Sequence, residues 1–171
     1  MKLQRGVAIW SGLVLLAVVL PVTGYLAGKE KPKGANKYLC TEPNPQGLCN
    51  SANTCGSPST PCTLDVKRTS SSASITPSIT GAKANELFCV QAGTTITWKS
   101  IQKNTGFVVD FGSTSPFDSG GTVIGGSDRE ASTVAKKPGC YRFSVGACVS
   151  GASYGMCGEG ATEVIVTGAG G

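Results

Sequence analysis

The side chains of this sequence with the most chemistry to offer are eight cysteines, which occur in a chain without a single histidine. An even number of cysteines in a short chain is typical of a disulfide framework. Their spacings include no Cys-x-x-Cys pair of the kind found in zinc ribbons and thioredoxin-like sites. We therefore expect disulfides, and the candidates are Cys40, Cys49, Cys55, Cys62, Cys89, Cys140, Cys148 and Cys157.

The absence of histidine removes several classes of active site. Ser-His-Asp and Cys-His nucleophile systems need an imidazole base, and the usual catalytic zinc and type 1 copper sites need imidazole ligands. Carboxylate, Ser-Lys, Tyr and thiolate chemistry remain formally possible, but these residues assemble into no convincing nucleophile–base pair. We therefore predict no catalytic residue, no enzymatic activity and no cofactor.

Phe117 is the candidate for an apolar contact with a partner. It follows Ser115-Pro116 in residues 112–126, a stretch rich in Gly and Ser that we interpret as a long loop. A large apolar side chain on an exposed loop marks an interaction site. The alternative, which we favour, is that Phe117 fills the core beneath the loop.

The positive charge of the chain is confined to its N-terminal part. Residues 1–37 hold six basic side chains and one acidic one, whereas residues 38–171 hold nine of each. The formal net charge of +5 therefore belongs to the N-terminal part alone. Because the remainder is neutral, it has no basic surface to neutralise phosphates, and we predict no nucleic-acid partner.

Residues 1–28 are expected to form a signal peptide or a membrane anchor. A basic start, Met1–Arg5, precedes an apolar run that begins at Val7, and small residues would permit cleavage after Gly24. If uncleaved, residues 7–27 are long enough to span about 30 Å of hydrocarbon and would contact the membrane. Both alternatives predict an extracytoplasmic protein, which is either anchored to the membrane or released, as a secreted or periplasmic protein.

The N-terminal residues are also compatible with another class of exported protein, a minor pilin-like subunit. Residues 4–9 resemble the leader junction of type IV pilin-like proteins, which implies cleavage after Gly6. However, Ser11 stands where those proteins usually have Glu, and Pro32 interrupts the continuation of the helix.

The rest of the chain divides into two parts. Residues 29–62 are expected to form a linker and a Cys-rich loop segment, because they carry no apolar period. Residues 63–168 contain short alternating segments separated by Gly and Pro turns, which predict an all-β sandwich. The expected strands are 63–67, 74–80 as an edge strand because of Pro77, 86–91, 94–99, 107–111, 131–136, 140–145 and 163–167.

Residues 63–168 resemble the cupredoxins, the plastocyanin- and azurin-type proteins. The matching segments, in order, are Gly93–Lys99, Asn104–Phe111, Pro138–Val145 and Gly158–Val166. This resemblance implies a Greek-key β-sandwich (cupredoxin-like), here preceded by an N-terminal apolar helix and the Cys-rich loop segment.

The copper ligands of that family are not matched. The first His position falls near Thr105 or Gly106, the Cys position on Val145, and the second His position on Cys148. Met156 alone matches, as the axial ligand, so a type 1 copper site is not expected. The alternative metal site is a soft Cu(I) site made by Cys148, Met156 and Cys157, which would make the chain a copper-handling or electron-transfer protein.

The disulfide pairing follows partly from locality and partly from this resemblance. Locality predicts that the four N-terminal cysteines pair among themselves. The resemblance implies that Cys148 and Cys157 pair across the loop that holds copper in a relative, and Cys89 would then pair with Cys140. We thus expect an exported, non-catalytic structural or binding domain stabilised by disulfides, with an unknown protein partner in the cell envelope.

Overall fold

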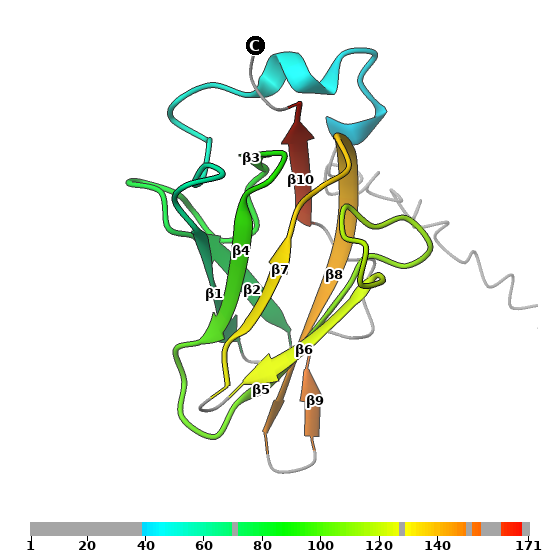
Figure 1. Ribbon diagram of the computed structural model, residues 1–171. Coiled ribbons are helices and arrows are strands. Elements are labelled where there is room, and N and C mark those ends of the chain that lie inside the picture. The colour runs from blue at the N-terminus through cyan, green and yellow to red at the C-terminus, as the bar shows by residue number, and fades with distance from the viewer. Residues whose placement is uncertain (1–38, 70–71, 127–128, 150–151, 155–161, 169–171) are drawn as a thin grey trace, which may run out of the picture. The chain divides into compact units, whose positions relative to one another are not determined.

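The computed structural model of this protein describes residues 39–69, 72–126, 129–149, 152–154 and 162–168 (Figure 1). The expected signal peptide or anchor, residues 1–28, lies outside these residues, as do Met156 and Cys157. Among the described residues, no helix is long and apolar enough to cross a membrane.

The described part of the chain is built almost entirely from strands. Two short 3-10 helices come first, η1 (Leu39–Thr41) and η2 (Pro45–Leu48). The strands that follow are β1 (Cys62–Arg68), β2 (Ala73–Pro77), β3 (Phe88–Gln91), β4 (Thr95–Ser100), β5 (Gly106–Asp110), β6 (Thr122–Gly126), β7 (Ala131–Val134), β8 (Gly139–Val149), β9 (Ala152–Tyr154) and β10 (Thr162–Thr167).

These strands form two sheets, which confirms the predicted all-β class. One sheet has the order β2-β1-β4-β7, and the other has the order β3-β10-β8-β5-β6, with β9 added beside β8. The pairs β1–β4 and β3–β10 are parallel, and the other pairs are antiparallel. As predicted from Pro77, β2 is an edge strand, because proline cannot donate to a further strand.

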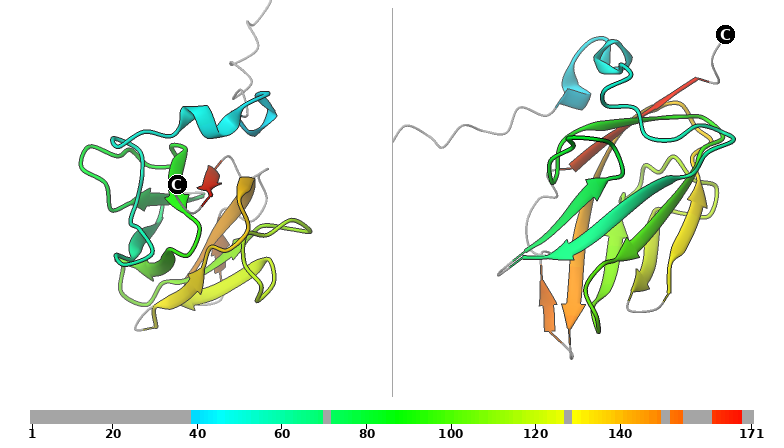
Figure 2. Two further views of the ribbon diagram at one scale, coloured as in Figure 1. Left: turned by 45° about the horizontal axis from the view of Figure 1, so that its top comes forward. Right: turned by 90° about the vertical axis from the view of Figure 1, so that its left-hand side faces the viewer.

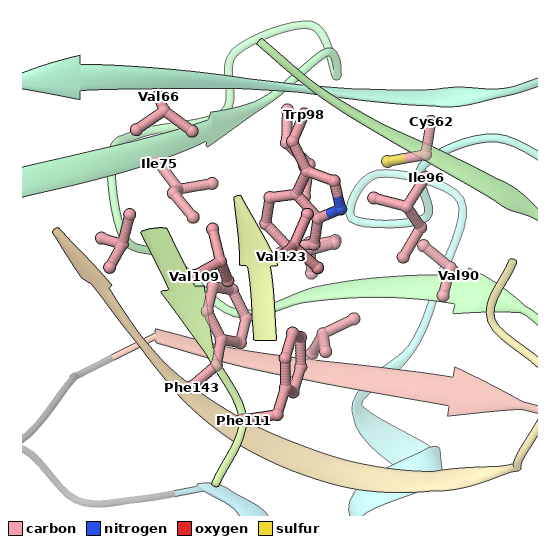
Figure 3. Packing of buried hydrophobic residues seen from close by; sticks show 14 of the residues in the cluster. Cys62, Val66, Ile75, Val90, Ile96, Trp98, Val109, Phe111, Val123 and Phe143 are labelled. Atoms are coloured by element: carbon pink, nitrogen blue, oxygen red, sulfur yellow. The ribbon is translucent and has the colours of Figure 1, made fainter. Parts of the chain in front are cut away.

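The core lies between the two sheets and follows the alternation of side chains along each strand. In β4, Ile96 and Trp98 are fully buried while their neighbours are partly exposed. The Trp98 ring meets Phe111 and Phe143 edge-on, with ring centroids 6.2 Å and 5.7 Å away (Figure 3). Each such ring pair adds about 0.5–1.5 kcal/mol beyond the area that it buries.

Two strands were missed by the sequence prediction, the three-residue β9 and the longer β6. Residues 112–126 were expected to form a loop, but Thr122–Gly126 is strand β6, which pairs with β5. Val123 is the buried side chain of this strand, and Ile124, on its other face, is 70% exposed. A strand with a single strongly buried position and two glycines at its end has too little alternation to be recognised from sequence.

Candidate functional site

The most specialised feature of the described structure is the Cys-rich segment, of which residues 39–55 are called the strap here. Its two short helices, η1 and η2, pack against β10 and β8 (Figures 1 and 2). It lies on the face of the six-stranded sheet that points away from the core.

Three neighbouring residues form a row across that face. Ile165 of β10 lies opposite Cys89 of β3 on one side and opposite Cys140 of β8 on the other. Val164 and Val166 belong to the core between the sheets, so Ile165 points the other way. Ile165 is nevertheless 0% exposed, and the helices that pack against β10 on this face belong to the strap.

The strap is fastened at both ends of this row by disulfides. Cys40 is bonded to Cys140, with the Cα atoms 5.3 Å apart, and Cys49 is bonded to Cys89, with the Cα atoms 5.8 Å apart. The bonded residues are 100 and 40 positions apart in sequence. The two disulfides therefore hold one short segment onto two strands that β10 separates.

Glu163 supplies a polar contact beside the first disulfide. Its carboxylate accepts the backbone N–H of Leu39 at 2.8 Å and that of Cys40 at 3.1 Å. Glu163 is 5% exposed, so a buried carboxylate satisfies two backbone donors of the strap. Glu163 was not among the predicted site residues, although the sequence carries a signal, since it is the one charged residue of a strand with an apolar centre.

The strap also protects the edge of the six-stranded sheet. Cys55 donates its N–H to the carbonyl of Cys89 at 2.8 Å, and Cys89 donates its N–H to the carbonyl of Asn53 at 2.8 Å. Strand β3 is the last strand of this sheet, so these bonds satisfy backbone groups that would otherwise be open to another chain.

The predicted disulfide pairing was wrong in two respects. The four N-terminal cysteines do not pair among themselves, because Cys40 and Cys49 reach Cys140 and Cys89 instead. Consequently Cys89 and Cys140 do not pair with each other, and β10 separates their strands.

One pair within the four N-terminal cysteines does form, between Cys55 and Cys62, seven positions apart. The predicted pairing of Cys148 with Cys157 involves a residue outside the described part of the chain. The fold therefore sets the long-range pairs, while locality accounts for the short one.

The positions that match the copper ligands of cupredoxins do not converge. Cys148 lies opposite Gly106, whereas Val145 lies opposite Val109. Along β8, Val145 is therefore three residues, or about 10 Å, from Cys148, the residue that pairs with Gly106. The Thr105 hydroxyl is buried and donates to the carbonyl of Lys103, and Val145 belongs to the apolar core. These residues do not fit a type 1 copper ion.

Cys148 is the described member of the alternative Cu(I) site. It is half-buried near the end of β8, where β9 pairs with it through Ser153. Met156 and Cys157 lie outside the described residues. Within the described ranges, no group of three His, Cys, Asp or Glu side chains is placed to hold a metal ion.

Phe117 is a core residue and not an exposed contact. It is 1% exposed, and its ring meets that of Phe111 edge-on at 5.1 Å. The loop folds inward because Phe117 N–H donates to the Ser115 hydroxyl at 3.1 Å, and Ser115 in turn donates to the carbonyl of Gly120 at 2.8 Å. Phe117 therefore fills the core beneath the loop, the alternative favoured from the sequence, and the other interpretation, an exposed contact for a partner, is wrong.

The same loop borders a shallow cavity of about 310 Å³. Lys136 lies 2.8 Å from the carboxylate of Asp118, and this hydrogen bond lowers the pKa of Asp118 and raises the pKa of Lys136. Hydroxyl groups supply most of the other polar atoms. The arrangement offers hydrogen bonds but no activated nucleophile. The lining residues are Thr95, Asp118, Ser119, Ser132, Thr133, Val134 and Lys136.

Comparison with known proteins does not identify a family for this chain. No protein-family model matches this chain, and no curated protein matches it. Among solved structures, the chain is similar to the copper protein rusticyanin, with 16% sequence identity and a TM-score of 0.33. That match covers 68% of this chain and 79% of rusticyanin. At this level of similarity it does not decide between functions.

Proposed function

We propose that this chain is an exported β-domain of cupredoxin-like fold that acts as a non-catalytic structural or binding component outside the cytoplasm. The observation that carries the proposal is the strap, which two long-range disulfides fasten to the outer face of a sheet. Structural disulfides persist in oxidising compartments and are rare in the cytoplasm. Residues 1–28 supply the route of export in this proposal.

The non-catalytic part of the proposal is supported by the residue types available. The chain has no histidine, and the position that matches the copper-binding Cys of cupredoxins is Val145, a side chain of the apolar core. Copper-carrying cupredoxins use that cysteine to hold the ion for electron transfer. In this chain the matching position is a core side chain, which favours a structural role.

The partner in this proposal is a protein of the cell envelope, and the membrane itself if residues 7–27 are retained. The strap begins at Leu39 and is bonded to β8 through Cys40–Cys140, so a retained anchor would precede a segment that is joined covalently to a central strand of the sheet. This arrangement suits a domain that is held at a surface.

Mass spectrometry of the protein purified from its own cells without chelators tests the proposal. We expect a mature N-terminus that starts at Met1 or after Gly24, at least three disulfides and no stoichiometric metal. Cleavage after Gly6 would instead indicate a pilin-like subunit. A stoichiometric copper ion with an intense blue absorption band would overturn the proposal.

Cell fractionation tests export separately. We expect the protein in the membrane, periplasmic or secreted fraction, with the strap disulfides formed. Recovery from the cytosol with reduced cysteines would contradict export.

A further inference from the structure

The strap is joined to the sheet at two points that differ in their exposure. Cys40 and Cys140 are both partly exposed. The second disulfide joins Cys49, which is also partly exposed, to Cys89, which is 0% exposed, and the short third disulfide joins Cys55 and Cys62, which are 2% and 0% exposed. The first disulfide is thus the one in which both cysteines are partly exposed. Because a reductant must reach a sulfur atom to attack it, the first disulfide is the most accessible of the three.

The contacts that hold the two ends of the strap also differ. Residues 53–55 pair with β3 through two backbone hydrogen bonds and lie beside the buried Cys55–Cys62 disulfide. The other end is held by the two bonds that Glu163 accepts from Leu39 and Cys40, and by packing of η1 and η2. Without Cys40–Cys140, non-covalent contacts hold this end of the strap.

We propose that Cys40–Cys140 is a reducible latch, which determines the strand to which the N-terminal segment is attached. When the latch is closed, the chain before Cys40 is bonded to β8. When the latch is open, the first covalent attachment is Cys49–Cys89 on β3, and residues 40–48 are released. The latch thus changes both the length and the position of the attachment while the β-sandwich stays folded.

The chemistry is thiol–disulfide exchange with an external dithiol. A thiolate of the dithiol attacks one sulfur of Cys40–Cys140, which breaks the S–S bond and releases the other cysteine as a thiolate that takes up a proton. The second thiol of the reagent then attacks the mixed disulfide and releases the remaining protein thiol. Two electrons pass from the dithiol to the protein, and the reagent leaves as its own disulfide.

The added reach of the N-terminal attachment when the latch opens follows from the length of the released chain. The nine released residues, 40–48, extend by at most about 3.3–3.6 Å each, or about 30 Å in total. The use of this change to alter the reach of a tethered domain rests on the proposed function, whereas the selective opening of the latch does not.

Graded reduction of the full-length oxidised chain tests the latch. Samples are treated with increasing dithiothreitol, alkylated, and mapped by mass spectrometry, with labelling at Cys148 and Cys157 scored separately. We expect Cys40 and Cys140 to be alkylated at least tenfold faster than Cys49, Cys89, Cys55 and Cys62. Equal rates for all three disulfides, or faster reduction of Cys55–Cys62, would overturn the proposal.

Limited digestion after Glu42 tests the change of attachment in Pro43→Ala, because the Glu42–Pro43 bond of the natural sequence resists proteases that cleave after Glu. With the latch closed, the fragment that ends at Glu42 should remain bonded to the domain, and selective reduction should release it. Hydrogen exchange should then rise at least tenfold in residues 41–48 while β1 and β4 stay protected. Loss of protection in β1 and β4 on the same timescale would show that reduction unfolds the domain, which would overturn the latch.

Two variants distinguish the latch from general loosening. In C40S/C140S the attachment should be open without reductant, so residues 41–48 should exchange rapidly from the start. In the matched control C55A/C62A, which avoids a hydroxyl at these two buried positions, residues 41–48 should keep the protection of the oxidised protein. Fractionation of cells that produce C40S/C140S would still report export, so failure of the latch and failure of the proposed function give different results.

Discussion

Glu163 accepts the backbone N–H of Cys40 at 3.1 Å, although the two residues are 123 positions apart in sequence. The same carboxylate accepts the N–H of Leu39, so it satisfies two donors at the point where the strap first contacts the sheet. This contact and the neighbouring disulfide join the beginning of the described chain to its last strand.

Replacing Glu163 should therefore destabilise the fold through the strap. In Glu163→Ala two backbone donors lose their acceptor, and each costs about 1–3 kcal/mol if it stays buried, so we expect the free energy of unfolding to fall by about 2–4 kcal/mol. Glu163→Gln keeps one amide oxygen as acceptor and should lose less. Urea unfolding measures both variants. An effect of Glu163→Ala no larger than that of Glu130→Ala, a change at an exposed carboxylate, would contradict the role of Glu163.

Removal of the disulfides should destabilise the protein in the order of the loops that they close. In the chain-entropy model, the Cys40–Cys140 loop of 100 residues is worth about 4.7 kcal/mol. The Cys49–Cys89 loop of 40 residues is worth about 4 kcal/mol. The Cys55–Cys62 loop of seven residues is worth only about 2 kcal/mol.

Paired Cys→Ala variants and denaturant unfolding at one pH measure this order. Alanine avoids placing a hydroxyl at the buried positions Cys55, Cys62 and Cys89. The largest loss of stability in C55A/C62A would show that native packing around these sulfur atoms outweighs the loop entropy.

Replacing Phe117 should lower the free energy of unfolding, because Phe117 belongs to the core and not to a contact surface. Phe117→Ala removes a side chain that is 1% exposed and packed on Phe111, so the free energy of unfolding should fall by about 3–5 kcal/mol. Ile124→Ala is the matched control, because Ile124 is 70% exposed. Thermal or urea unfolding compares the two. If the two variants lose equal stability, the loop does not hold Phe117 in the core.

The stability of the domain should depend on the ionisation of Tyr141 at high pH. Burial raises the pKa of the Tyr141 phenol, and its hydroxyl donates to the carbonyl of Lys137 at 2.9 Å. The folded state thus favours the neutral phenol. Its contribution is fully present below the unfolded pKa of about 10 and is lost as the pH rises through the higher folded pKa.

Unfolding measured between pH 9 and pH 11.5 checks this prediction, with absorbance at 295 nm to follow the phenolate. Tyr141→Phe should lose about 1 kcal/mol at neutral pH through the missing hydrogen bond and should have a shallower decline above pH 10. An unchanged decline in this variant would assign the pH dependence to other groups.

The alternation of apolar residues made most of the sandwich predictable from the sequence. In β4, Ile96 and Trp98 are buried as expected, and in β8 Phe143 and Val145 are buried on one face. Strand β6 was missed because packing against β5, and not its own pattern, makes it a strand. Local pattern is informative where one face of a strand is buried and the other is not.

The strap could not be predicted from the spacing of its cysteines. Sequence distance favours local pairs, but the pairing of Cys40 and Cys49 depends on which strands are neighbours in the sheet. The insertion of β10 between β3 and β8 places Cys89 and Cys140 on either side of Ile165, where the two ends of the strap reach them. That arrangement is a property of the topology, which no short segment encodes.

The burial of Trp98 against aromatic edges makes the protein its own optical probe. The chain has one other tryptophan, Trp10, which cleavage after Gly24 would remove. In the mature form, a single indole that is 0% exposed would then emit at short wavelength and give sharp near-ultraviolet circular dichroism bands. Fluorescence would consequently follow the integrity of the space between the two sheets without any added label.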